Sequence, residues 1–132
     1  MDSLKKRNPV LPLWLTPTQA RFIPVSEKFL KQTEKIAEGI SKEKIRADVD
    51  DRNESVQKKI RDAEIEWVPY IVVVGERELK DRKLAVRFRE TGKIKRLTKT
   101  SLINMIKKIT KDKPFKPLPL PKLLTKRPTF IG

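Results

Sequence analysis

The side chains most able to do chemistry in this 132-residue chain are basic, since 32 residues are Lys or Arg and only 17 are Asp or Glu. His and Cys are both absent from the sequence. The commonest general base, the best thiolate nucleophile and the main nitrogen and sulfur ligands of metal ions are therefore missing. Paired carboxylates could still catalyse a reaction, but the many Lys and Arg favour ionised carboxylates over protonated ones. We expect no catalytic residue and no metal site in this chain.

The formal net charge of +15 indicates a polyanionic partner. Such a surplus attracts polyanions and favours phosphate contacts through counterion release. Proteins of thermophiles also carry many Lys and Glu, but that alternative explains a high charge of both signs rather than an excess of one. Nucleic acid is therefore the expected partner, and at this point RNA and DNA fit equally well.

The spacing of apolar residues predicts the elements that must position these charges. Strands are expected at residues 20–25, 45–49, 70–74, 84–88 and 94–97. Helices are expected after Ser26, after the turn at 50–53 and from Thr100 or Ser101, with a charged turn at 76–82. This order predicts an α/β fold, a three-layer sandwich in which a mixed sheet of about five strands is flanked by three helices.

The two ends of the chain differ in composition from the middle. We expect residues 1–9 to form a polar, basic linker and residues 10–110 to form the domain. Residues 111–132 hold five of the ten prolines, which lack an N–H donor and fix φ. This basic tail is expected to run extended in a groove, either on this domain or on a neighbour. No apolar run approaches the length needed to cross a bilayer, so we expect a cytoplasmic protein with no membrane partner.

Several short motifs follow one another over about residues 10–110. They are Trp14-Leu15-Thr16-Pro17-Thr18-Gln19, Asp51-Arg52-Asn53-Glu54, Lys59-Ile60-Arg61, Val68-Pro69-Tyr70, Gly75-Glu76-Arg77-Glu78 and Ala85-Val86-Arg87. This set, in this order and spacing, resembles the anticodon-binding domain shared by the threonyl, prolyl, histidyl and glycyl members of the class II tRNA synthetases. The tail PFKPLPLPKLLTKRPTFIG resembles the extension that ends archaeal threonyl synthetases.

The resemblance to the threonyl branch lies in Glu78 and Arg87, nine residues apart. It implies that these two residues read the middle G of the threonine anticodon. A carboxylate can accept from guanine N1–H and N2–H₂, while an Arg fork donates to O6 and N7. Cytosine would instead turn two acceptors towards the carboxylate. On residue type alone, Glu78 is an ordinary solvated carboxylate and Arg87 a surface residue paired with Asp81.

The resemblance also implies partners that lie outside this chain. It implies tRNA(Thr) as ligand and the catalytic domain of a parent threonine–tRNA ligase as neighbour, with dimerisation only through that absent domain. ATP and zinc would belong to the catalytic domain, and this chain would need no cofactor. Two other functions remain open, namely a synthetase-like accessory or protein-interaction module without tRNA selectivity, and a general RNA-binding protein of ribosomal type.

Further candidate residues each have a structural alternative. Asn53 either caps the second helix or contacts the anticodon loop. Trp67 stands where many relatives have a basic residue, and it either packs in the core in helical register with Ala63 or stacks on an unpaired base. Weaker contacts, to the RNA backbone, are expected from Arg52, Lys59, Arg61 and Arg89. Charged residues on a helix are otherwise most often a solvated face.

Overall fold

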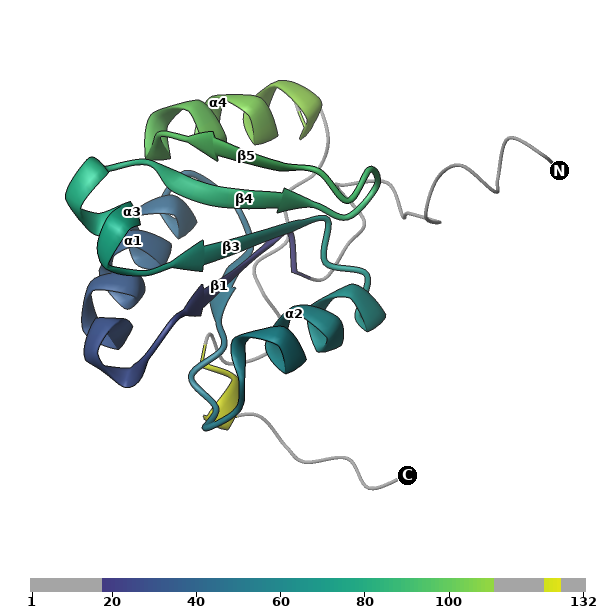
Figure 1. Ribbon diagram of the computed structural model, residues 1–132. Coiled ribbons are helices and arrows are strands. Elements are labelled where there is room, and N and C mark those ends of the chain that lie inside the picture. Colours follow the sequence, from purple (N-terminus) through teal and green to yellow (C-terminus); the bar gives the residue numbers. More distant parts are fainter. Residues whose placement is uncertain (1–17, 111–122, 127–132) are drawn as a thin grey trace, which may run out of the picture.

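A computed structural model describes residues 18–110 and 123–126 of the chain, and the α/β fold predicted from the sequence is confirmed (Figure 1). Five strands form one mixed sheet in the order β2-β1-β3-β4-β5. They are β1 (Ala20–Pro24), β2 (Ala47–Val49), β3 (Tyr70–Val74), β4 (Leu84–Phe88) and β5 (Ile94–Leu97). Strands β2, β1 and β3 are parallel, whereas β4 and β5 are antiparallel to their neighbours.

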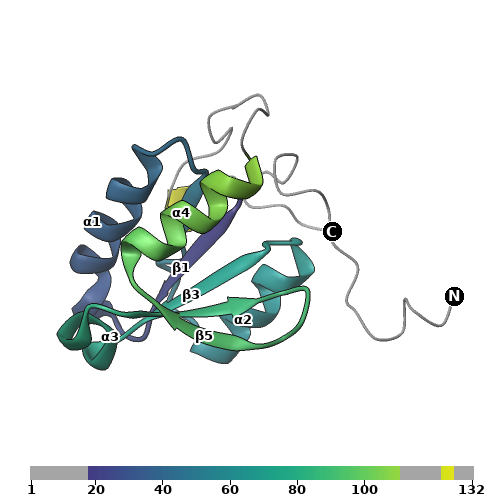
Figure 2. The ribbon, with the colours of Figure 1, turned by 90° about the horizontal axis from the view of Figure 1, so that it is seen from above.

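Helices cover both faces of this sheet. The α-helices are α1 (Leu30–Ser41), α2 (Val56–Ile65), α3 (Glu76–Asp81) and α4 (Lys99–Thr110), and the 3₁₀ turns are η3 (Glu27–Phe29) and η4 (Leu124–Lys126). Seen from above, α1 and α4 lie on one face and α2 lies on the other (Figure 2). The three helices expected from the sequence are α1, α2 and α4, and the structure adds the short α3 where a turn was expected.

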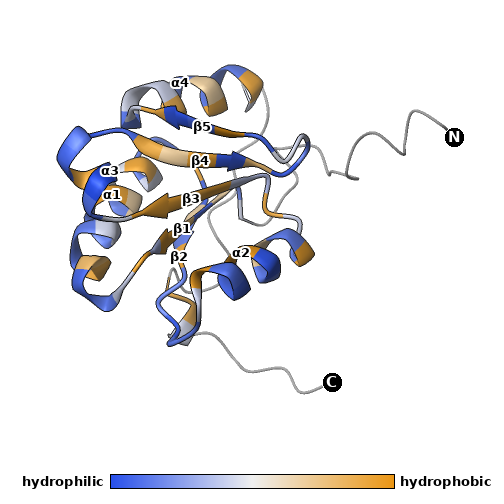
Figure 3. Ribbon diagram, viewed as in Figure 1, coloured by the Kyte–Doolittle hydropathy of each residue, from blue (hydrophilic) through white to orange (hydrophobic). Residues whose placement is uncertain are grey.

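The alternation of strand side chains divides the core into two parts. The larger part joins strand residues such as Phe22, Val72 and Val86 to Ile40 of α1 and Leu102 of α4. The smaller part lies under α2 and consists of Ile23, Ala63, Val68 and Ile71. Figure 3 shows the hydrophobic colour concentrated in β3, at the centre of the sheet. Since α2 packs against β1 and β3, no helix of the described chain covers β4 and β5 on that face (Figure 1).

Two features at the start of α3 stabilise this helix. Gly75 lies very close to Val25, and the Glu78 side chain caps the first turn. A Cβ on Gly75 would lie 2.9 Å from Val25 Cγ2, so glycine lets the two chain segments meet. The Glu78 side chain then accepts a hydrogen bond of 2.9 Å from the Gly75 N–H, which satisfies a free donor at the helix start. The helix ends at Asp81, and Arg82, its C-cap residue, has a left-handed φ of 57°.

A buried charged network fixes α2 to the sheet. Arg21 of β1 is 0% exposed and lies opposite Asp48 of β2. Its guanidinium donates to both Asp48 oxygens at 3.0 Å and to both Glu66 oxygens at 2.7 and 3.0 Å. Burial lowers the pKa of Arg21, but the hydrogen bonds to Glu66 and Asp48 outweigh it and the net pKa is raised. The sequence pattern predicts only an apolar strand at this place.

The predicted linker at residues 1–9 and the motif residues 14–17 lie outside the described residues, as do residues 111–122 and 127–132 of the predicted tail. Within the tail, Leu123 makes a parallel bridge with Val49 of β2. Thr125 donates to Asp51 through its N–H at 3.0 Å and through its hydroxyl at 2.6 Å. The helices in the described ranges are all too short or too polar to span a membrane.

Candidate nucleic-acid interface

Glu78 and Arg87 lie on the same face of the sheet. Strand alternation places Ile71, Val73 and Gly75 on the face that α2 covers, and Arg87 pairs with Ile71. A Cβ on Gly75 would point from this face and meet Glu78 Oε1 at 3.1 Å, so the carboxylate lies there too. From Ile71 to Val74 the strand rises about 10 Å. The two charged groups are therefore arranged along one strip of sheet rather than in contact.

The strip between them is only partly covered. Its floor is Val73 and Ala85, which pair with each other across β3 and β4 and are half-buried. On the neighbouring β5, Arg96 pairs with Ala85 and Ile94 pairs with Arg87. Ile94 is 60% exposed and adds an apolar side chain to this surface. We call these residues, Val73, Ala85, Arg87, Ile94 and Arg96, the open sheet face.

Arg87 is held by α2 in the free chain. Its Nε lies 3.6 Å from Glu64 Oε1, and the Arg87 side chain is 35% exposed. The sequence-based alternative, a pair between Arg87 and Asp81, is wrong, because Asp81 lies beyond the opposite end of β4 and pairs with Arg96 at 3.1 Å. A half-exposed ion pair at this distance contributes little, so the guanidinium can exchange Glu64 for a ligand at small cost.

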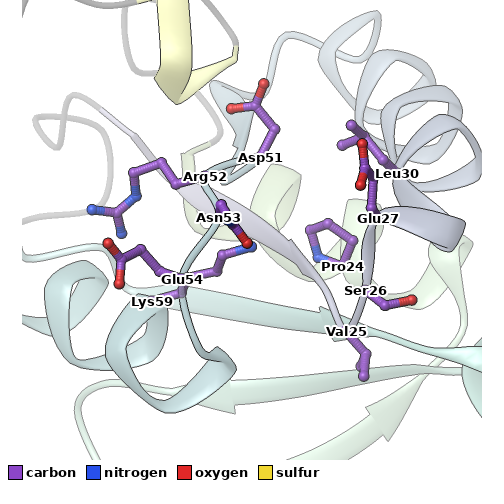
Figure 4. A pocket seen from close by; sticks show the side chains of 10 residues that line it. All are labelled: Pro24, Val25, Ser26, Glu27, Leu30, Asp51, Arg52, Asn53, Glu54 and Lys59. Carbon is purple, nitrogen blue, oxygen red and sulfur yellow. The ribbon is translucent and has the colours of Figure 1, made fainter.

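Asn53 lies in a pocket at the carboxyl end of the parallel strands. The pocket has a volume of about 490 Å³ and lies between the loop after β1 and the loop after β2 (Figure 4). In α/β sheets, ligands commonly bind in the crevice outside the carboxyl ends of the strands. The pocket shares Val25 with the Gly75 turn, so it adjoins Glu78. Its lining residues are Pro24, Val25, Ser26, Glu27, Leu30, Asp51, Arg52, Asn53, Glu54 and Lys59.

The alternative role of Asn53 as a helix cap is wrong. Ser55 is the N-cap of α2, and its hydroxyl accepts from the Lys58 N–H at 3.1 Å. A serine at this position, in extended conformation one residue before the helix, fulfils the cap requirement by itself. Asn53 is exposed two residues earlier, and its amide is free of that task.

Two of the expected backbone-contact residues are bound within the protein. Arg52 pairs with Asp50 at 2.7 Å and with Asp62 at 3.0 Å, and hydrogen bonding to Asp50 raises its pKa. Lys59 is 5% exposed and donates to the Asp50 carbonyl at 3.1 Å. Their charges hold the loop after β2 in place. The helical spacing does not predict that Lys59 is buried, because its ammonium group donates to a backbone carbonyl that lies close only in the folded chain.

Trp67 and Arg89 form one unit at the other end of α2. The core role expected for Trp67 is wrong, because α2 ends at Ile65 and Trp67 follows in a left-handed conformation with φ of 64°. Its ring is half-buried, and the Arg89 guanidinium lies 4.7 Å from the ring centroid. Arg89 also donates to the Glu64 carbonyl at 2.8 Å. The arrangement is a cation–π pair at the surface beside Arg87.

Arg61 is the expected backbone contact that the fold leaves exposed. It lies three residues before Glu64, so the two side chains are neighbours on the surface of α2. Within the described part of the chain, no group of three or more acidic, His or Cys residues is placed to hold a metal ion. The arrangement offers a half-buried apolar floor, flanking charges and a polar pocket, which suits unpaired bases and phosphates.

The comparisons with known proteins point the same way. Residues 19–109 match the family model described as "Anticodon binding domain". The chain is 51% identical over 128 residues to the threonine–tRNA ligase of Thermococcus sibiricus, and the match covers 97% of this chain and 20% of that protein. For the threonine–tRNA ligase of Pyrococcus horikoshii the identity is 50% over 126 residues, with 96% and 20% covered. The chain thus spans about a fifth of the length of the curated relatives it matches.

A solved structure also has this fold. It is the crystal structure of the RNA binding domain of threonyl-tRNA synthetase from Cryptosporidium parvum Iowa II, with a TM-score of 0.71 and 28% sequence identity. The match covers 81% of this chain and 26% of that chain.

Proposed function

Because the chain belongs to the anticodon-binding domain family, and within it to the archaeal-type threonyl-tRNA synthetases, we propose that it binds the anticodon loop of tRNA(Thr) and reads its middle G. In this role it is a module of a threonine–tRNA ligase, and its neighbour in the parent protein is the catalytic domain. Glu78 and Arg87 select the base, Asn53 contacts the loop, and Arg61 contacts phosphate.

The arrangement of Glu78 and Arg87 carries this proposal. Both lie on the α2 face of the sheet, on either side of the half-buried apolar pair Val73 and Ala85. A base lying on Val73 and Ala85 can meet a carboxylate on one edge and a guanidinium on the other. Guanine supplies two donors and two acceptors for this pair, and no other base supplies the same set.

The first expected result concerns the middle base of the anticodon. We expect tRNA(Thr) with middle G to bind this chain about 10- to 100-fold more tightly than the same tRNA with middle C, since a bidentate contact is worth about 1–3 kcal/mol. The difference arises because C leaves the Arg87 donors unmatched and turns acceptors towards Glu78. The measurement is a filter-binding or fluorescence titration at moderate, fixed salt.

Two outcomes would contradict the proposal in different ways. Equal affinity for the two tRNAs would leave only charge-driven binding. Weak binding of both tRNAs, together with a stoichiometric protein partner, would favour the protein-interaction module instead.

A second expected result distinguishes general attraction to the tRNA phosphates from selection of the middle base. Arg61→Ala should weaken both tRNAs by a similar factor and reduce the slope of log K against log salt by about 1, because one phosphate contact is lost. Arg52→Ala is not an adequate control, since Arg52 is paired with Asp50 and Asp62. Lys35→Ala is suitable, because Lys35 is exposed on α1, which packs on the opposite face of the sheet. An Arg61→Ala variant that changed the ratio between the two tRNAs would show that Arg61 reads the base.

A further inference from the structure

The C-terminal part of the chain meets the loop that carries Asn53. Leu123 pairs with Val49, the last residue of β2, and its side chain packs against the larger core. Strand β2 is at the edge of the sheet, where unpaired backbone groups are otherwise open to solvent. Residues 123–126, which we call the C-terminal clamp, therefore cover the sheet edge at the point where the loop begins.

Thr125 of the clamp donates hydrogen bonds to both carboxylate oxygens of Asp51 in the loop. The Thr125 N–H donates to Asp51 Oδ1 at 3.0 Å, and the Thr125 hydroxyl donates to Asp51 Oδ2 at 2.6 Å. The two residues are 74 positions apart in sequence, so this contact ties the tail to the domain. Figure 4 shows Asp51 on the side of the pocket nearest to the clamp, and Asn53 inside the loop two residues later. Hydrogen bonds that involve a charged group are stronger than neutral ones.

The rest of the loop is fastened from other directions. The Asp50 N–H donates to the Phe22 carbonyl at 2.9 Å, which continues the sheet. Lys59 of α2 donates to the Asp50 carbonyl, and Arg52 joins Asp50 to Asp62 of α2. These bonds fix the start of the loop against β1 and α2. The clamp adds the contact at Asp51, on the side away from α2.

We propose that Thr125 is a positioning residue, which holds the loop at residues 50–54 in the shape that presents Asn53 to RNA. The inference rests on the proposed function, because it assumes that Asn53 meets the anticodon loop. Its physical basis is preorganisation: a loop that is ordered before binding does not lose conformational freedom on binding. The tail then contributes to RNA affinity without touching RNA through Thr125.

The test uses the full chain with Thr125→Val, which keeps the shape of the side chain and the backbone donor but removes the hydroxyl donor. Exchange of the Asp50 and Glu54 amide protons, measured by NMR, is expected to become several-fold faster. The dissociation constant for tRNA(Thr) is expected to rise about 3- to 10-fold, because the loop is then less ordered before it binds. Thr125→Ser should restore both values. Thr100→Val, on an exposed position of α4, should change neither.

Each outcome decides the proposal. Unchanged exchange in Thr125→Val overturns the clamp. Faster exchange with unchanged tRNA affinity overturns the positioning role, and failure of Thr125→Ser to restore the affinity does the same. If the unaltered chain does not prefer tRNA(Thr), the proposed function fails and the RNA part of this inference fails with it. The exchange rates would still decide whether the clamp holds the loop.

Discussion

Replacing Arg21 with Met is expected to lower the free energy of unfolding by about 3–5 kcal/mol. Asp48 is 0% exposed, and both of its oxygens accept from the Arg21 guanidinium. Met fills much of the volume of Arg but supplies no donor, so the variant leaves a buried carboxylate without its cation. Urea denaturation followed by tryptophan fluorescence measures the effect as a lower midpoint with a similar slope.

The control is an arginine pair at the surface. Arg77 is 77% exposed and lies 3.9 Å from Asp81, so Arg77→Met should change the stability by about 1 kcal/mol or less. A double variant tests the cause further. Asp48→Leu in the Arg21→Met background should recover part of the loss, because no buried unpaired ion is left and Glu66, which also loses its partner, is half-exposed to solvent. Equal losses in Arg21→Met and Arg77→Met would contradict the assigned role of the buried network.

The network at Arg21 also positions the interface. Glu66 follows α2 directly and is bound by Arg21, so the end of α2 has a fixed place on the sheet. Glu64 and Trp67 flank Glu66, and they contact Arg87 and Arg89. Loss of Arg21 should therefore loosen the α2 side of the open sheet face. Any effect of Arg21→Met on RNA binding must be compared at a temperature where the variant is folded.

The elements that sequence periodicity predicts well are those whose apolar residues decide their shape. Strand β3 is a run of buried apolar residues, and α1 and α4 each bury a stripe against the sheet. Helix α3 has no such stripe, and it depends on the Glu78 cap and on the close approach of Gly75 to Val25. The pairing of Arg21 with Asp48 cannot be predicted from the sequence pattern, because the residues around each of them are typical of an apolar strand. Their mutual neutralisation depends on β1 and β2 pairing in one register.

The sequence predicts which residues belong to the candidate site better than it predicts the burial and the contacts of each side chain. The resemblance to the anticodon-binding domain is confirmed by the family match over residues 19–109. The sequence cannot reveal that the Lys59 ammonium is buried while Arg61 is exposed, since both belong to one charged helix. The same is true of Trp67, whose helical register with Ala63 ends when α2 stops at Ile65. These differences arise from helix ends and from carbonyls that tertiary packing brings close.

Replacing Glu78 with Gln is expected to reduce the preference for middle G over middle C by about 10-fold or more, within the roughly 1–3 kcal/mol of a bidentate base contact. The Gln carbonyl can still accept from the Gly75 N–H, so α3 keeps its cap and the fold is expected to persist. The Gln amide is a donor, however, and it opposes the N1–H and N2–H₂ donors of guanine. Towards cytosine the same amide meets acceptors, so affinity for the middle-C tRNA should rise as affinity for the middle-G tRNA falls. Titration of both tRNAs at the same salt concentration measures the ratio.

The matched control for this result is Glu76→Gln, which changes an exposed carboxylate in the same first turn of α3 and should leave the ratio unchanged.

A double-mutant cycle of Glu78→Gln with Arg87→Lys tests whether Glu78 and Arg87 contact the same base. Lys cannot reproduce the guanidinium fork, so it loses one of two parallel contacts. If Glu78 and Arg87 grip opposite edges of the same guanine, losing either one lets the base shift and weakens the other contact, and the two losses should not add. Strict additivity would mean that the residues act on different groups of the RNA, and a full preference for G in Glu78→Gln would remove Glu78 from the reading of the anticodon.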